Sequence, residues 1–138
     1  MSPIARFGVS LDKELLLKFD KLIKAKSYTN RSEAFRGLIR QELVKKEWKD
    51  ADEVIGAATL IYDHHKRELV NKLLDIQHKV GSCIISSQHI HMDHDNCLEI
   101  LALKGSPEKV QHLSDSLKAV KGVKHSTLSM STTGQGIV

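Results

Sequence analysis

One alternating segment near the N-terminus constrains the fold of this chain more than any other feature. Between residues 4 and 11, apolar side chains alternate with polar or small ones, the pattern of a half-buried β-strand. Helical spacing follows over residues 15–23 and 30–43, so this strand has no neighbour nearby in the sequence. A lone strand leaves its backbone groups unpaired, and about 50 residues bury too little surface to be stable alone. We therefore expect this region to dimerise.

Two copies of the strand would pair as an antiparallel ribbon, which fits the major groove of B-DNA. Arg6, Gly8 and Ser10 share one parity and would face outward, so Arg6 and Ser10 are candidates for contacting bases. The charge agrees with this interpretation. Residues 1–50 carry 12 basic and 7 acidic side chains, whereas the remaining 88 residues carry 9 and 10. The sequence therefore assigns polyanion binding to the N-terminal third.

The N-terminal region ends at a charged stretch. Its second helix has a start signal, because Asn30 is followed three residues later by Glu33, as in a capping box. Residues 45–53, KKEWKDADE, are the best candidate for a boundary. We predict domains over residues 1–50 and 51–138.

The second part of the chain alternates strands with helices. The patterns predict strands over residues 54–62, 83–92, 97–104 and 123–130, helices over 67–80 and 106–120, and a tight turn at 93–96. The order β-α-β-β-α-β is the split ferredoxin-like arrangement. The chain is therefore predicted to be α+β, a βαα ribbon-helix-helix domain followed by a βαββαβ domain.

Metal-binding side chains cluster in the predicted hairpin. His89 and His91 are two residues apart and point to the same face of a strand. A turn centred near His94 places Cys97 opposite residue 90 or 91. Two imidazoles and a thiol then converge, as in a transition-metal site. The alternative is three polar residues that merely share a solvated face.

A fourth ligand would have to come from elsewhere. His78 lies one turn before the end of the preceding helix, but a strand carries the hairpin about 25 Å from that helix end. His78 would then close the site of a partner related by a two-fold axis, unless it only interacts with the helix dipole. Glu99 is either an outer-shell acceptor for an imidazole or a surface residue. Zinc, nickel and copper all accept such ligands, so the metal stays open.

No stretch of about 18 apolar residues and no signal-peptide core occurs, which predicts a cytoplasmic protein without a membrane partner. In a reducing compartment, Cys83 and Cys97 are expected as free thiols or ligands. The hairpin register also places Cys83 opposite residue 104 or 105, too far from Cys97 for a disulfide.

Several segments occur together in the order and spacing of one known family. They are Arg6-Phe7-Gly8-Val9-Ser10-Leu11, Tyr28-Thr29-Asn30-Arg31-Ser32-Glu33-Ala34, Gln77-His78, Gln88-His89-Ile90-His91-Met92-Asp93 and Asn96-Cys97-Leu98-Glu99. Together they resemble the NikR family of nickel-responsive transcriptional regulators, over nearly the whole chain.

The resemblance implies a ribbon-helix-helix domain joined to an ACT-like domain in a homotetramer, a dimer of dimers. It implies one square-planar Ni(II) per subunit, held by His89, His91, Cys97 and His78 of a facing subunit. Metal loading would promote repression through a palindromic operator in double-stranded DNA, usually of nickel-uptake genes. The phosphate contacts that the resemblance implies are Arg31, Ser32, Lys66 and Arg67.

Two positions depart from the family pattern. Gly8 stands where Ser or Thr is common, so one base-reading side chain is missing. Gly37 stands where an Asp would help to hold a cation between the domains, although Glu33 remains.

Three other functions fit parts of the sequence. A regulator of this architecture could sense an amino acid, zinc or copper. A zinc enzyme would need a general base such as His94 or Glu99, but no hydrolytic signature accompanies them. An antitoxin-type DNA binder leaves the second domain unexplained. We predict a nickel-dependent regulator that is not an enzyme.

Overall fold

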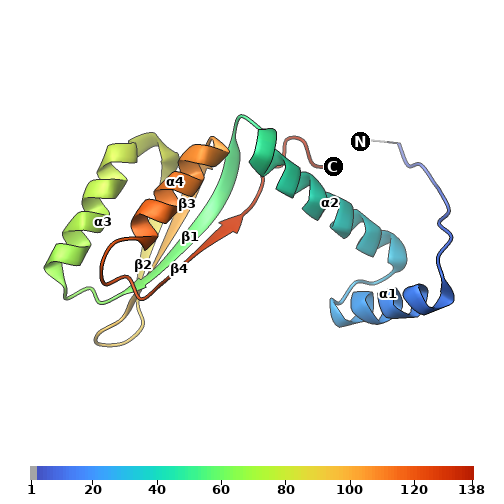
Figure 1. Ribbon diagram of the computed structural model, residues 1–138, viewed down its shortest axis with the longest axis horizontal. Coiled ribbons are helices and arrows are strands. Elements are labelled where there is room, and N and C mark those ends of the chain that lie inside the picture. Colours follow the sequence, from blue (N-terminus) through green and yellow to red (C-terminus); the bar gives the residue numbers. More distant parts are fainter. Residues whose placement is uncertain (1–2) are drawn as a thin grey trace. The chain divides into compact units, whose positions relative to one another are not determined.

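The computed structural model describes residues 3–138, which form two compact units. The first unit runs to Leu43 and includes Ile137–Val138, and the second is Val44–Gly136. Helices alone form the regular structure of the first unit, whereas a four-stranded sheet with helices dominates the second (Figure 1). None of the helices over residues 3–138 is long and apolar enough to span a bilayer.

The first unit is built on α1 (Lys13–Ala25) and α2 (Arg31–Asp50). The rings of Phe19 and Phe35 pack with their centroids 5.3 Å apart. Ala34, which precedes Phe35 in the sequence, is fully buried. The apolar spacing that predicted both helices therefore also supplies the small core between them.

The predicted start of α2 is confirmed. Asn30 Oδ1 accepts the backbone N–H of Glu33 at 2.9 Å, which satisfies one of the free amides of the first turn. The Glu33 carboxylate pairs with Arg36, so only the Asn30 half of the predicted capping box forms.

The strand predicted over residues 4–11 is not present in the single chain. Residues 3–12 are irregular. A strand requires a hydrogen-bonded neighbour, and within the described part of the chain this segment has none. The ring of Phe7 in this segment lies against the ring of Phe35, with centroids 6.4 Å apart. The pairing with a second copy stays a prediction.

The second unit has the predicted βαββαβ order. Its elements are β1 (Val54–Tyr62), α3 (Arg67–Val80), the 3-10 turn η1 (Gly81–Cys83), β2 (Ile84–His91), β3 (Cys97–Gly105), α4 (Pro107–Lys118) and β4 (His125–Met130). All paired strands are antiparallel, in the order β2-β3-β1-β4. The α+β fold class is confirmed.

The core lies on one face of this sheet. Burial alternates along β1 and β3, and their buried positions form a single cluster with Leu69 and Leu73 of α3 and with Leu113 and Leu117 of α4. Both helices therefore cover the same face (Figure 1). Each fully buried leucine contributes about 1.5–3 kcal/mol. The alternation along β3 also buries Cys97 at its start.

The predicted domain boundary is not marked by a break in structure, because α2 continues through the charged stretch to Asp50. Trp48 in this last part of α2 packs against the sheet core, and its Nε1 donates to the Ser131 carbonyl at 2.8 Å. The compact units divide between Leu43 and Val44. The boundary after residue 50 stays a prediction.

Candidate functional site

The β2–β3 hairpin places the predicted metal donors on one face of the sheet. Its register pairs His91 with Cys97 and His89 with Glu99, which confirms the predicted position of Cys97. Paired residues of antiparallel strands point to the same side. Because Cys97 and Glu99 are buried in the helix-covered core, both histidines point to that face.

His89 and Cys97 lie close enough to share an ion. His89 Nδ1 is 3.9 Å from Cys97 Sγ. The His89 side chain is 49% exposed, whereas Cys97 is buried, so solvent reaches the pair from the imidazole side. A thiolate and an imidazole suit nickel, zinc or copper better than magnesium or calcium. The residues present therefore fit a thiophilic transition-metal ion.

Glu99 is fixed beside this pair. It is 1% exposed and accepts hydrogen bonds from the Tyr62 hydroxyl at 2.6 Å and from Gln77 Nε2 at 2.9 Å. Burial, and then the hydrogen bond to Glu99, raises the pKa of Tyr62, so the phenol stays a donor. His89 Nε2 lies 3.6 Å from Glu99 Oε1. The carboxylate is thus well placed to orient the imidazole.

Sequence reasoning missed Tyr62 and Gln77 as supports of this carboxylate. Tyr62 ends the predicted strand over residues 54–62, so its position was known. Its place beside the site follows only from the pairing of Tyr62 with Cys97 between β1 and β3. Gln77 reaches Glu99 from α3, and the spacing of residues along β3 does not indicate which residue of α3 packs over Glu99.

The His91 ring stacks on another histidine and does not join the pair of His89 and Cys97. Its ring stacks on His64, with centroids 4.5 Å apart and planes at 10°. Among residues 3–138, the donor atoms of His89, His91 and Cys97 do not all lie within 4.8 Å of one another. His64 Nδ1 is itself buried without a hydrogen-bond partner in the described structure. The His91 ring would have to leave this stack to join Cys97.

His78 is exposed in the last turn of α3. Its neighbour Gln77 reaches Glu99, which pairs with His89. The sequence-based separation of about 25 Å between this helix end and the hairpin is therefore wrong, because α3 lies alongside the hairpin. Exposure leaves the His78 ring accessible to a second chain.

The candidate base-reading residues Arg6 and Ser10 are both exposed. A side chain at Gly8 would also be free, because a Cβ built there has no atom within 4 Å. The structure therefore offers no packing reason for glycine at this position.

Arg31 is already engaged within the chain. Its Nε and Nη2 donate to the two carboxylate oxygens of Asp20, each at 2.9 Å. The hydrogen bond from Arg31 lowers the pKa of Asp20, and the same bond raises the pKa of Arg31. The predicted phosphate contact at Arg31 thus competes with an internal ion pair. Ser32 remains exposed at the helix N-terminus, where backbone amides favour anions.

Lys66 and Arg67 are exposed at the start of α3. Together with Lys72 and Lys121 they line an open pocket of about 400 Å³. Glu68 lines the same pocket and pairs with Lys72 at 3.4 Å. Lys66, Arg67 and Lys121, beside the free amides of a helix N-terminus, therefore supply the charge to bind phosphate.

The structure shows what occupies the space beside Gly37, the position at which the family pattern has Asp. A Cβ at this position would lie 2.3 Å from the Tyr28 hydroxyl oxygen and 2.9 Å from Tyr28 Cζ. Tyr28 therefore fills the space that a side chain at residue 37 would need. An Asp there could not be added without moving the Tyr28 ring.

Two family models match this chain. The one described as the NikR C terminal nickel binding domain matches residues 55–131, and the one described as the ribbon-helix-helix protein, copG family, matches residues 5–46. The chain belongs to the NikR family. This confirms the resemblance read from the sequence, and membership of a family of transcriptional regulators confirms that the chain is not an enzyme.

Curated relatives match over essentially their whole length. Proteins named "Putative nickel-responsive regulator" are 62% identical in Syntrophus aciditrophicus, 57% in Chlorobium phaeobacteroides and 54% in Nitratidesulfovibrio vulgaris. The matches cover 98%, 96% and 99% of this chain and 98%, 98% and 99% of the relatives.

Among solved structures, an uncharacterized protein from Thermotoga maritima is similar with a TM-score of 0.51 and 14% identity. The match covers 56% of this chain and 95% of that one. At this identity the likeness concerns the fold alone.

Proposed function

We propose that this NikR chain is a nickel-dependent repressor that binds a palindromic operator in double-stranded DNA when Ni(II) is bound, and that it controls nickel uptake in the cytoplasm. The observation that carries the proposal is the pair of His89 Nδ1 and Cys97 Sγ, 3.9 Å apart, within a region that matches a nickel-binding domain. A thiol beside an imidazole has no evident role in binding an amino acid, so the nickel hypothesis is favoured over amino-acid sensing.

The ion would be held by His89, His91 and Cys97 of one chain and by His78 of the partner subunit, one ion per subunit. Glu99 would orient the His89 ring, since its buried carboxylate lies 3.6 Å from His89 Nε2. His78 is exposed at the end of α3, as a ligand given to a second chain must be. Bound nickel would supply a fixed link between the two chains.

Exposed apolar surface on the first unit supports dimerisation there. Ile4 and Phe7 are 77% and 76% exposed, and an open pocket of about 640 Å³ lies between the N-terminal segment and the helices, lined in part by Phe19 and Ile39. Large apolar side chains gathered around a hollow mark an interaction surface. A second copy would cover them. Dimers joined again through the nickel-binding units would give the homotetramer.

Operator binding would combine base contacts with phosphate contacts. Arg6 and Ser10 would enter the major groove, and the start of α2 at Arg31 and Ser32 would meet the backbone. Lys66 and Arg67 would add phosphate contacts from the second unit. Nickel favours the arrangement of chains that reaches both half-sites, so the metal and operator sites are coupled.

Operator binding measured with and without nickel tests this function. We expect His89→Ala to lose the nickel-dependent gain in DNA affinity, while His112→Ala, an exposed histidine on α4, keeps it. An affinity gain with zinc or an amino acid but not with nickel would contradict the nickel assignment. A full nickel response in His89→Ala would contradict the ligand set.

A further inference from the structure

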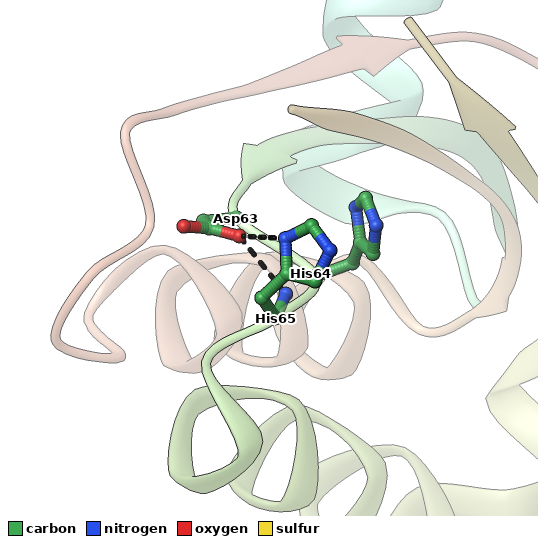
Figure 2. Close-up of side chains that lie close together, drawn as sticks. All are labelled: Asp63, His64 and His65. Atoms are coloured by element: carbon green, nitrogen blue, oxygen red, sulfur yellow. Dashed lines mark hydrogen bonds and ion pairs between the residues drawn. The ribbon is translucent and has the colours of Figure 1, made fainter. Parts of the chain in front are cut away.

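The basic pocket of about 400 Å³ has two walls that come from different parts of the chain. One wall, with Lys66 and Arg67, belongs to the end of the β1–α3 loop and the start of α3. Asp63 holds this loop, because its Oδ1 accepts the backbone N–H of His65 at 2.9 Å and lies 3.2 Å from His65 Nδ1 (Figure 2). The Asp63 carbonyl also accepts the Lys66 N–H at 3.2 Å. Hydrogen bonds within the loop therefore position this wall.

The other wall, with Lys121 and Gly122, lies between α4 and β4. Gly122 has a φ of +100°, which favours glycine, and a Cβ there would lie 3.3 Å from Leu69 Cδ2 of α3. Two residues further on, the Lys124 N–H donates to the Ile61 carbonyl at 2.8 Å. The segment 121–124 is thus short and closely packed, so a displacement of Lys124 would be passed on to Lys121.

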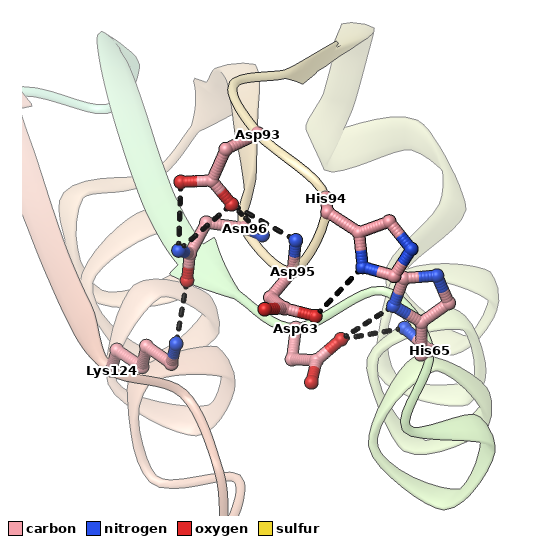
Figure 3. A network of polar contacts seen from close by, with 7 residues as sticks. All are labelled: Asp63, His65, Asp93, His94, Asp95, Asn96 and Lys124. Carbon is pink, nitrogen blue, oxygen red and sulfur yellow. Dashed lines mark hydrogen bonds and ion pairs between the residues drawn. The ribbon is translucent and has the colours of Figure 1, made fainter.

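Lys124 joins this second wall to the β2–β3 hairpin. Its Nζ donates to the Asn96 side-chain oxygen at 2.5 Å (Figure 3). Asn96 ends the β2–β3 turn and directly precedes Cys97, a proposed nickel ligand. The contact therefore connects the neighbour of a metal ligand with a segment that lines the phosphate pocket, 28 residues away in the sequence.

The β2–β3 turn lies between two proposed nickel ligands, His91 and Cys97. Asp93 fixes the shape of this turn. Its Oδ1 accepts the backbone N–H groups of Asp95 and Asn96 at 2.9 and 2.8 Å, and both of its carboxylate oxygens accept from Asn96 Nδ2 (Figure 3). These internal hydrogen bonds make the turn move as one piece. Because the His91 ring must leave its stack to bind an ion with Cys97, nickel binding would shift this piece together with Asn96.

We propose that Lys124 is a positioning residue that passes the nickel-bound position of the β2–β3 turn to Lys121, so that Lys121 meets a DNA phosphate when nickel is bound. This role rests on the proposed function of a nickel-dependent repressor. The hydrogen bond to Asn96 forms only while the turn and the segment 121–124 keep their relative positions, so it favours one arrangement of the two. Coupling of this kind is reciprocal, and operator DNA should also raise the affinity for nickel.

Operator affinity of the full-length protein, measured with and without Ni(II), tests this role. We expect Lys124→Met to lower the nickel-dependent gain in affinity on the order of tenfold, because a hydrogen bond from a charged group is lost. Lys124→Arg keeps the charge and a donor and should retain most of the gain. Both variants should keep the thiolate-to-nickel absorption. Lys118→Met is the matched control, since it removes an exposed lysine from the last turn of α4, and it should keep the gain.

Combination with Lys121→Met separates positioning from a direct phosphate contact by Lys124. If Lys124 acts through Lys121, the double variant should lose no more of the gain than Lys121→Met alone. If Lys124 itself meets a phosphate, the two losses should multiply. Amide exchange gives a second readout that needs no DNA. Nickel should slow exchange over residues 121–124 in the wild type but not in Lys124→Met.

Three results would overturn the positioning role: a full nickel-dependent gain in Lys124→Met, losses that multiply in the double variant, or wild-type exchange over residues 121–124 that nickel does not change. Loss of the absorption band in Lys124→Met would place its effect at the metal site and would also contradict the proposal. Absence of any nickel-dependent gain in the wild type would instead refute the proposed function, and the exchange measurement would still decide whether Lys124 links the two segments.

Discussion

At the scale of single residues, Glu99 shows how a buried carboxylate is tolerated. Its two oxygens accept from Tyr62 and Gln77, so the charge is not left without partners in the core. The same bonds fix the carboxylate next to His89. Glu99 therefore links the packing of the domain to the orientation of one predicted nickel ligand.

Removing this carboxylate should cost stability as well as orientation. We expect Glu99→Ala to lower the free energy of unfolding by about 1–3 kcal/mol, because Tyr62 and Gln77 lose their buried partner. Glu53→Ala is the control: Glu53 is exposed in a 3.5 Å pair with Lys104 and should change stability by less than about 1 kcal/mol. Urea unfolding followed by circular dichroism measures both. Equal effects in the two variants would contradict the role given to Glu99.

Asp20 gives the first unit a dependence on pH. The hydrogen bond from Arg31 holds the pKa of Asp20 below its ordinary value of 3.8. A carboxyl whose folded-state pKa is depressed stabilises the fold fully above its ordinary pKa and loses that contribution as the pH falls through the folded value. We therefore expect the α1 amides to lose exchange protection below about pH 3.8.

Asp20→Asn tests this assignment, because the variant keeps the shape but has no proton to bind. Its exchange protection over α1 should be lower than that of the wild type at neutral pH and should change less on acidification. If the variant shows the same acid loss as the wild type, another carboxyl is responsible.

At the scale of elements, the sequence predicts most accurately where local pattern decides the structure. The strand over residues 54–62 and the helix over 67–80 have the predicted bounds, because alternation and helical spacing were clear and Gly81 ends the helix. Residues 4–11 behave differently. Their alternation is that of a strand, but the hydrogen bonds of a strand require a neighbour, and no local pattern can supply one.

The apolar residues of this segment lead to a prediction about dimerisation. Val9 is 51% exposed and lines the open pocket of the first unit. We expect Val9→Asp to prevent or strongly weaken dimerisation, because a second copy would bury the new charge without a partner. Gly8→Ser is the neighbouring control and should leave association unchanged, since nothing lies within 4 Å of a Cβ there. Analytical ultracentrifugation measures both, and an unaffected dimer in Val9→Asp would contradict this interface.

The candidate metal site was predictable only in part, because some of its contacts join residues that are far apart in the sequence. The shared face of His89, His91 and Cys97 follows from strand parity and turn position, which are local. The stacking of His91 on His64 brings the end of β2 against the β1–α3 loop, and residue spacing within the hairpin does not reveal this contact. The distance of His78 was misjudged for a related reason, because counting residues along a strand ignored the helix that runs beside it.

At the scale of the whole molecule, the central claim is that each nickel site is shared between two chains. The family match establishes a nickel-binding domain joined to a ribbon-helix-helix domain, and the hairpin supplies three donors of suitable chemistry. Among residues 3–138, no third histidine has a donor atom within 4.8 Å of the donor atoms of both His89 and Cys97. We assign the role of the remaining ligand to His78 of the partner subunit.

Subunit mixing tests this claim most directly. His78→Ala and Cys97→Ser should each lose the thiolate-to-nickel absorption band as pure proteins. Unfolded together in urea and refolded as a mixture, they should regain about a quarter of the wild-type band, because half of the pairs are mixed and each mixed pair has one complete site. No recovery on mixing, with a normal band in His78→Ala alone, would show that each chain binds nickel by itself.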